Sequence, residues 1–261
     1  MAWFRRDFIK KMAVASLAVA PASSAFAKKA DGPAKAQNSS DLERRLERME
    51  AIHEVQNLAG QIHFLMGVNL YQRCLPLFAL DTPGVRVEMD WGVYEGKEGV
   101  KRFFLGYHGT HDAERVDSPD LKGDMHLHLV TTPVIQVADD LQTARGTWIS
   151  PGYETMGHLQ PDGSIKFSAE WICLKYGIDF IKEDGKWKIW HFHTFVIFVC
   201  PYDKPWTEVE YHQRGLDLPP EKAPDRLKPF PPPNMYGIDR KQVNVPVLPE
   251  HYSTFNDTTS Y

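Results

Sequence analysis

Apolar positions along the chain change their spacing near residue 124. Before that point, residues 41–66 carry an apolar side chain every three or four positions, which predicts a long amphipathic helix. Ser40 or Asp41 can cap this helix, because a side-chain oxygen there accepts hydrogen bonds from free amides of the first turn. We predict two further helices at about 68–80 and 96–107, with a short strand at 85–89 between them. The apolar stripe of the first helix comprises Leu42, Leu46, Met49, Ile52, Val55, Leu58 and Ile62.

From residue 125 onward the apolar period becomes two, which indicates β-strands. We predict strands at 125–137, 141–150, 165–181 and 187–199, with the turn "EDGK" between the last two. Helices followed by an antiparallel meander indicate an α+β domain, in which the helices pack on one face of a curved sheet. The run "WICL" at 171–174 is apolar on both faces of its strand, and such a sheet needs a second cover. We therefore expect a homo-oligomer, either a dimer or a trimer.

The first 27 residues have the three parts of an export signal. They have a basic start, an apolar stretch at about 12–22 and a small-residue "AFA" end. Arg5 and Arg6, followed by "DFIK", resemble the twin-arginine motif, which implies export of a folded protein to the periplasm or extracytoplasmic envelope. An ordinary secretion signal or an uncleaved anchor is the alternative. The apolar stretch is shorter than the roughly 20 residues that cross a bilayer, so we expect no stable membrane span after signal removal.

The remaining segments outside the predicted domain differ from it in composition. Residues 28–40 are small and polar, and we predict a linker there. The domain itself is predicted to span 41–200. Residues 201–261 hold most of the prolines, including "PFPPPN", and proline interrupts both helices and sheets. We expect this segment to be an extended arm that lies over the domain or over a neighbouring subunit.

Composition excludes several classes of protein. The net charge is -4, and no stripe of Lys and Arg occurs outside the N-terminus, so we expect no nucleic-acid partner. Three cysteines, Cys74, Cys173 and Cys200, are too few for a disulfide framework. The chain has no CxxC, no P-loop and no GxGxxG motif, and we expect no cofactor. Of the residues, 43% are hydrophobic, which is enough for a substantial core.

Three stretches resemble the SnoaL-like proteins of the NTF2-like superfamily. They are "LPLFALDTPGVRVEMDWGVYEGKEGVKRFF" at 75–104, "HLVTTPVIQVADDLQTARGTWIS" at 128–150 and "EDGKWKIWHFHTF" at 183–195. The resemblance covers about residues 42–205 and implies a cone-shaped α+β barrel around an apolar pocket that the helices close. Its members include scytalone dehydratase, ketosteroid isomerase, polyketide cyclases and plain binding proteins, so the fold alone does not determine the function.

His126 and His128 are two residues apart on a predicted strand and therefore share a face, so either both enter the pocket or neither does. By the resemblance, His128 matches the pocket histidine that shuttles protons in the dehydratase. An imidazole suits this role because its unperturbed pKa is near 6.5. We expect His128 to be the base, with His63 of the long helix or Tyr153 as its partner, although Tyr153 also fits a loop position at the pocket rim. A carboxylate base, as ketosteroid isomerase needs, is not evident.

His191 and His193 form a second H-x-H pair, for which three places are open. They can line the pocket mouth, lie on the outer sheet face in a dimer contact, or join His126 and His128 in a metal site of four imidazoles. No nearby carboxylate shares the spacing, and the resembled family is metal-free, so we expect no metal. Aromatic residues are expected as pocket walls, although a core or interface position suits them equally. The predicted substrate-binding residues are His126, Trp148, Tyr176, Trp171, His193 and Phe195.

Together these features predict an exported, cofactor-independent enzyme that works by His-mediated proton transfer. The expected activity is that of a lyase of the dehydratase type, or of an isomerase or cyclase. The expected substrate is a small hydrophobic ring compound with hydroxyl groups, because an aromatic pocket with few polar groups suits such a ligand. The alternatives are a non-catalytic protein that binds a small molecule, and a His-rich metalloprotein.

Overall fold

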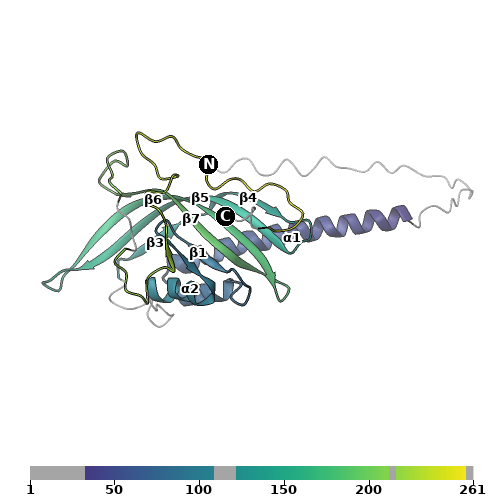
Figure 1. Cartoon of the computed structure of the whole chain (residues 1–261), viewed down its shortest axis with the longest axis horizontal. Helices are drawn as coiled ribbons and strands as arrows, with labels where there is room; N and C mark the ends of the chain where they lie inside the picture. The colour runs from purple at the N-terminus through teal and green to yellow at the C-terminus, as the bar shows by residue number, and fades with distance from the viewer. Residues whose placement is uncertain (1–32, 109–121, 212–215, 257–260) are drawn as a thin grey trace, which may run out of the picture. The chain divides into compact units, whose positions relative to one another are not determined.

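The computed structural model of the chain describes residues 33–108, 122–211, 216–256 and 261 (Figure 1). The predicted export signal, residues 1–27, lies outside these ranges. Residues Leu42–Tyr261 form one compact unit. Within the described ranges no helix is long and apolar enough to span a membrane.

The first predicted helix is confirmed, and it begins earlier than its pattern indicated. Helix α1 covers Pro33–Gly67, so the later part of the predicted linker is helical. Proline is favoured in the first turn of a helix, where its missing N–H has no intrahelical partner to lose. Only the second half of the apolar stripe packs into the core, where Val55 and Ile62 are fully buried. Three apolar residues of the first half are exposed: Leu42, Leu46 and Met49.

The other two predicted helices are short. The segment predicted at 68–80 forms only the 3-10 helix η1, Tyr71–Leu77, with Pro76 inside it. The segment predicted at 96–107 is helical throughout, as the α-helix α2, Gly96–Lys101, followed by the π-helical turn η2, Arg102–Tyr107. Phe103 and Phe104 of η2 are fully buried, which fixes this turn against the core.

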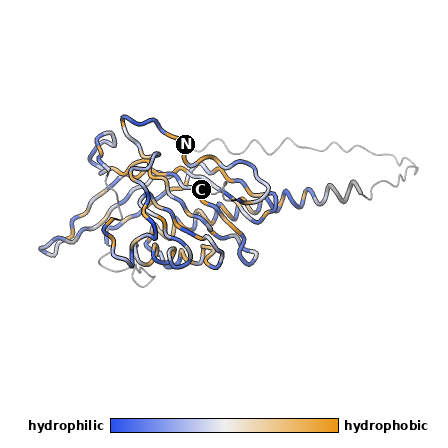
Figure 2. Tube along the Cα trace, in the orientation of Figure 1, coloured by the Kyte–Doolittle hydropathy of each residue, from blue (hydrophilic) through white to orange (hydrophobic). Residues whose placement is uncertain are grey.

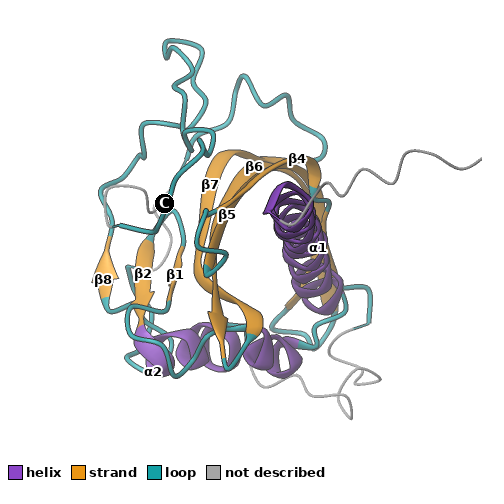
Figure 3. Ribbon diagram, turned by 90° about the vertical axis from the view of Figure 1, so that its right-hand side faces the viewer, coloured by secondary structure: helices purple, strands orange, loops and turns teal. Residues whose placement is uncertain are grey.

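The strands form one sheet that curves around α1 without closing into a ring (Figure 3). Its order is β3-β5-β6-β7-β1-β2-β8, and β4 also pairs with β5. All neighbours are antiparallel except β1 and β7, which run parallel. The strands are β1 Arg86–Glu88, β2 Gly92–Glu95, β3 Met125–His128, β4 Thr131–Val137, β5 Thr143–Leu159, β6 Ile165–Glu183, β7 Lys186–Pro201 and β8 Arg226–Leu227. The α+β architecture with a helix on a curved sheet is therefore as the pattern predicted.

The predicted strand 125–137 is two strands, β3 and β4, that meet the same partner, β5. The chain leaves the ladder at Leu129, and the pairing with β5 shifts between Thr131 and Val134. Thr132 has a φ of 48°, and Pro133 has no N–H to donate to the ladder. The shift matters for the site: continued from Val134 and Thr147, the register would set His128 opposite Tyr153, whereas the observed register sets it opposite Gly152.

The described part of the proline-rich arm lies over the domain, which is one of the two placements that the sequence left open. Strand β8 extends the sheet beside β2, and the Asn234 side chain donates to the carbonyl of Val196 at 2.8 Å. Met235 and Tyr252 of the arm are buried. Polar and apolar positions are interleaved along the strands (Figure 2). The arm covers part of the outer face, where Phe255 packs on Trp190.

A second part of the outer face stays uncovered by the described residues. It lies on β3, β5 and β6, on the side of the sheet opposite to His126 and His128. Its exposed apolar residues are Met125, Leu127, Leu129, Ile149, Tyr153 and Trp171. If the predicted second subunit exists, we expect it to cover this surface. The oligomeric state stays a prediction.

Candidate active site

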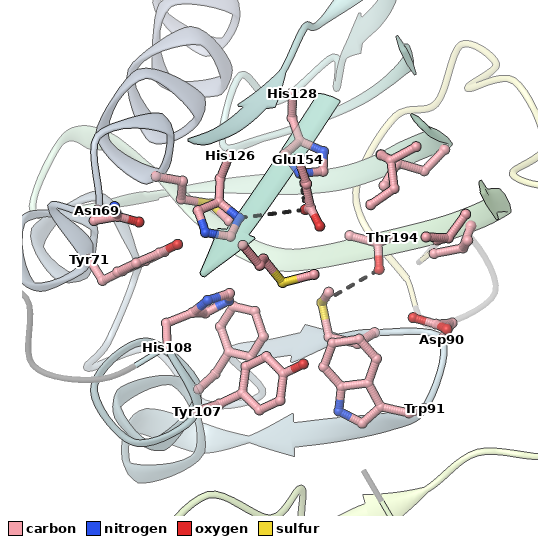
Figure 4. Close-up of a pocket in the computed structure, with 18 of the residues that line it drawn as sticks. Asn69, Tyr71, Asp90, Trp91, Tyr107, His108, His126, His128, Glu154 and Thr194 are labelled. Atoms are coloured by element: carbon pink, nitrogen blue, oxygen red, sulfur yellow. Dashed lines mark hydrogen bonds and ion pairs between the residues drawn. The ribbon is translucent and has the colours of Figure 1, made fainter. Parts of the chain in front are cut away.

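A cavity of about 440 Å³ lies between the end of α1, the turns η1 and η2, and the inner face of β3, β5, β6 and β7 (Figure 4). Most of its wall is apolar or aromatic, which is the usual character of a small-molecule site. The described apolar lining includes Met66, Met89, Trp91, Phe103, Ile172, Leu174, Tyr176 and Phe192. The one-residue register shift between β3 and β4 turns the side chains of His126 and His128 toward this wall.

A carboxylate lies between the two imidazoles of β3. In the β3–β5 register His126 faces Glu154 and His128 faces Gly152, so all three side chains share the inner face. Glu154 Oε1 lies 2.8 Å from His128 Nε2 and 3.8 Å from His126 Nδ1 (Figure 4). A Cβ on Gly152 would lie 2.9 Å from the Leu127 carbonyl, so glycine allows this close approach of the two strands.

Electrostatics hold this carboxylate in its ionised form. The Glu154 side chain is only 12% exposed, and burial by itself raises its pKa. The hydrogen bonds and positive charge that the His126 and His128 imidazoles offer outweigh burial, and the pKa of Glu154 lies well below its ordinary value. At neutral pH the cavity therefore contains an anion in contact with two imidazoles.

Further polar groups line the cavity opposite this cluster. The Tyr71 ring stacks on His108 with centroids 4.3 Å apart, and Figure 4 shows its hydroxyl directed into the cavity on the side of His126. Burial, with a smaller effect of Glu154, raises the pKa of Tyr71, so the phenol stays protonated and can donate a hydrogen bond. The other polar lining residues are Asn69, Asp90, Tyr107, Asp124, His158 and Thr194.

His126, His128 and Tyr176 line the cavity, in agreement with their predicted positions. His63 does not line it. Its ring lies edge-on against Tyr176 at 4.4 Å, and its Nδ1–H donates to the Ala59 carbonyl at 2.6 Å. Burial, chiefly, and to a smaller extent the charge of His128 lower the pKa of His63 to about 4. His63 is therefore a neutral residue behind the cavity wall.

Tyr153 is placed outside the cavity, contrary to its expected position. Side chains alternate along a strand, so Tyr153 points outward where its neighbour Glu154 points inward. Its ring packs against Trp171 at 5.2 Å on the exposed outer face, which removes Trp171 from the cavity as well. Trp148 is a core residue beside Phe180 and does not line the cavity.

His191 and His193 lie on the outer face of β7, because Phe192 and Thr194 between and after them line the cavity. His191 Nδ1 pairs with Asp179 Oδ2 at 2.8 Å, and His193 Nε2 lies 2.8 Å from Lys228 Nζ. Phe195 shares this face and packs on His193 at 3.9 Å. Neither His193 nor Phe195 therefore lines the cavity, and the cover over them is the arm of the same chain.

The metal site of four imidazoles does not form. The two H-x-H pairs lie on opposite faces of the sheet, which keeps their imidazoles apart. In the part of the chain that the structure describes, no group of three or more His, Cys, Asp or Glu residues could hold a metal ion.

Sequence reasoning missed the central residue, Glu154, together with Tyr71, Asn69, Asp90 and His108. The sequence analysis placed the neighbouring Tyr153 in the pocket. Because two adjacent strand residues cannot share a face, that assignment excluded Glu154. A signal did exist: β5 continues well beyond residue 150, and pairing β3 with this extension sets an acid opposite the first H-x-H pair. Tyr71 and Asn69 lie in a turn without periodicity, so no pattern marks them.

The fold and the site together define a class: α+β proteins in which a curved, open sheet wraps a helix and encloses an apolar cavity with an acid–imidazole cluster. Residues 44–193 match the SnoaL-like domain family, and the chain belongs to that family. No curated protein matches the chain significantly.

Solved structures with a similar course of the chain have little sequence in common with it. A candidate scytalone dehydratase from Novosphingobium aromaticivorans is 13% identical, with a TM-score of 0.45 over 61% of this chain and 93% of that one. A candidate dehydratase of the NTF2-like family from Streptomyces avermitilis is 16% identical, with a TM-score of 0.42 over 56% and 96%. A hexachlorocyclohexane dehydrochlorinase from Novosphingobium barchaimii is 14% identical, with a TM-score of 0.41 over 62% and 96%.

Proposed function

We propose that the protein is a lyase of the dehydratase type, which removes water from a small, largely apolar ring compound without a cofactor. The observation that carries the proposal is the contact of Glu154 with His128 and His126 inside an apolar cavity. β-Elimination needs a base for a C–H proton and an acid for the leaving hydroxyl. The cluster offers groups for both roles: the reaction requires one imidazole in its neutral form and the other protonated, and the adjacent carboxylate compensates the positive charge.

The reaction follows from this arrangement. The neutral imidazole takes the proton from a carbon next to a carbonyl group, and the C–H electron pair becomes the new C=C bond. The C–O bond on the adjacent carbon breaks, and the protonated imidazole gives its proton to the departing hydroxyl, which leaves as water. The proton taken from carbon replaces the one given away, so the imidazole pair keeps its total charge. His126 is the more accessible of the two, with a side chain 22% exposed against 12% for His128.

Two further features support an elimination. The Tyr71 phenol can donate to the substrate carbonyl oxygen, on which negative charge develops as the proton leaves. The apolar wall formed by residues such as Trp91 and Phe192 excludes water, which strengthens the electrostatic interactions within the cavity.

The test uses the mature chain and a panel of cyclic β-hydroxy ketones, starting with 3-hydroxycyclohexanone. Loss of water gives a conjugated enone, which is followed by ultraviolet absorbance and by mass spectrometry. Turnover by the wild type that Glu154→Gln abolishes and Tyr153→Phe retains would support the proposal. Binding without any conversion would instead indicate a binding protein, and a shifted double bond without loss of water would indicate an isomerase.

We also propose that residues 1–27 direct export to the periplasm, because Arg5 and Arg6 resemble a twin-arginine signal. The expected result is that the protein is found in the periplasmic fraction of its bacterial host. Replacing both arginines by lysine should leave it in the cytoplasm. Export of the double-lysine chain at the wild-type level would contradict a twin-arginine route.

A further inference from the structure

The proline-rich arm encloses a second cavity of about 210 Å³, which none of the features above uses. Its described lining comes from residues 206–211 and 236–240, outside the part of the chain that matches the family. Two hydrogen bonds attach this region to β7. The Tyr236 amide donates to the Ile197 carbonyl at 2.7 Å, and the Asn234 side chain donates to the Val196 carbonyl at 2.8 Å.

Trp206 provides a flat aromatic surface at this cavity. One face of its indole stacks on Phe198 of β7, with centroids 5.4 Å apart and an interplanar angle of 21°. The residue is nevertheless 51% exposed, so a large part of its apolar surface is available to a ligand. A tryptophan that is held by stacking on one face and exposed elsewhere is well suited to bind a saturated ring. The C–H bonds on the face of such a ring are attracted to the electron-rich indole.

Polar groups without partners lie around the same cavity. The Tyr211 hydroxyl is buried, and no described residue makes a hydrogen bond to it. Asp239 and Arg240 also line the cavity, and neither side chain forms an ion pair or hydrogen bond with another described residue. Arg240 is close enough to Tyr211 for its charge to act on the phenol. A buried hydroxyl without a partner is costly, so a hydroxyl to which no described residue is bonded is a candidate to bond a ligand.

These groups select a neutral ligand with several hydroxyls. Asp239 accepts hydrogen bonds, Arg240 donates them, and the Tyr211 phenol can do both. The adjacent carboxylate and guanidinium compensate each other in charge, so neither an anion nor a cation is favoured overall. The volume accommodates one six-membered ring. We propose that this cavity binds a monosaccharide unit, with the C–H face of the sugar on Trp206 and its hydroxyls on Asp239, Arg240 and Tyr211.

Saturation-transfer NMR on the full mature chain tests this proposal, with the methyl glycosides of glucose, galactose and mannose as probes. We expect at least one glycoside to receive saturation mainly at the C–H protons of one ring face. Trp206→Ala should abolish the signal, and Trp206→Phe should keep it. Asp239→Asn and Arg240→Met should each weaken binding about tenfold, since each removes a hydrogen bond to a charged group.

Three controls make the result decisive. Cyclohexylmethanol has the same ring size without the hydroxyl pattern, and it should not compete with the glycoside. Glu154→Gln should bind the glycoside as the wild type does, which separates this site from the proposed active site. Asp239 and Arg240 are exposed, so their variants test the site even if Trp206→Ala lowers the melting temperature. The proposal is overturned if no glycoside binds the wild type, if cyclohexylmethanol competes equally, or if both polar variants bind as tightly as the wild type.

Discussion

Glu154 Oε1 lies 2.8 Å from His128 Nε2 across the β3–β5 pair, where His128 faces not Glu154 but Gly152, two residues earlier. This diagonal contact leaves His126, which faces Glu154 directly, at 3.8 Å and more accessible. One carboxylate therefore contacts two imidazoles at unequal distances.

Glu154→Gln should reduce the turnover number of the proposed elimination by about 100-fold or more, because the protonated imidazole that serves as the acid loses the charge that compensates it, and general acid–base catalysis typically contributes at least that factor. Gln has nearly the same shape as Glu and lacks only the charge, so the Michaelis constant should change little. Steady-state kinetics measure both parameters. The matched control is Tyr153→Phe, one residue away on the outer face, which should retain wild-type turnover. A Glu154→Gln enzyme within a few-fold of the wild type would contradict a role for the carboxylate.

His128→Asn should raise the pKa of Glu154 toward its ordinary value. Burial already raises this pKa, and the two imidazoles are what lower it, so the removal of the closer one weakens the opposing effect. Carbon-13 NMR titration of the labelled carboxyl group measures the change. His126→Asn should give a smaller rise, because its contact is longer. Equal rises in the two variants would show that the 2.8 Å contact has no special weight.

Acid should destabilise the fold through His63 well before the carboxylates titrate. The folded pKa of His63 is about 4 and its reference value is 6.5, so the unfolded chain binds the proton first as pH falls. Its contribution is complete above pH 6.5 and is lost between pH 6.5 and 4, at about 1.4 kcal/mol per pH unit. Urea unfolding at a series of pH values measures this slope.

The variant for this experiment is His63→Leu, which has no group to titrate and suits the apolar surroundings of Tyr176 and Phe192. Its free energy of unfolding should fall less steeply between pH 6.5 and 4 than that of the wild type. His193, whose pKa burial lowers to about 3, should leave a residual slope in the variant. Identical slopes in both proteins would mean that His63 can be protonated in the folded state.

The proline-rich arm should contribute to the free energy of unfolding as core residues do. Met235 is 3% exposed, so Met235→Ala is expected to lower the free energy of unfolding by about 2–5 kcal/mol through lost burial and the cavity it leaves. Ile238→Ala, three residues along the arm at an exposed position, is the matched control and should change it by less than about 0.5 kcal/mol. If the two variants melt alike, the arm is attached only loosely to the domain.

The α+β class, the long first helix, the meander and the shared face of His126 and His128 could all be predicted from the sequence. Each depends on a local rule: a period of three or four on a helix, a period of two on a strand, or two residues on one strand face. These local rules gave wrong element boundaries where the chain interrupts a helix or strand. Pro133 and Thr132 divided the first predicted strand, and Pro76 reduced the second predicted helix to a 3-10 turn.

What the sequence by itself determined is therefore the alternation of each strand, and with it the fact that His126 and His128 share a face. Only the tertiary structure decided which acid meets them, because strand register and the break between β3 and β4 are set by packing along the whole sheet. The same packing placed His191 and His193 on the opposite face and His63 behind Tyr176. Contacts between residues far apart in the chain depend on the free energy of the whole fold, which no local pattern contains.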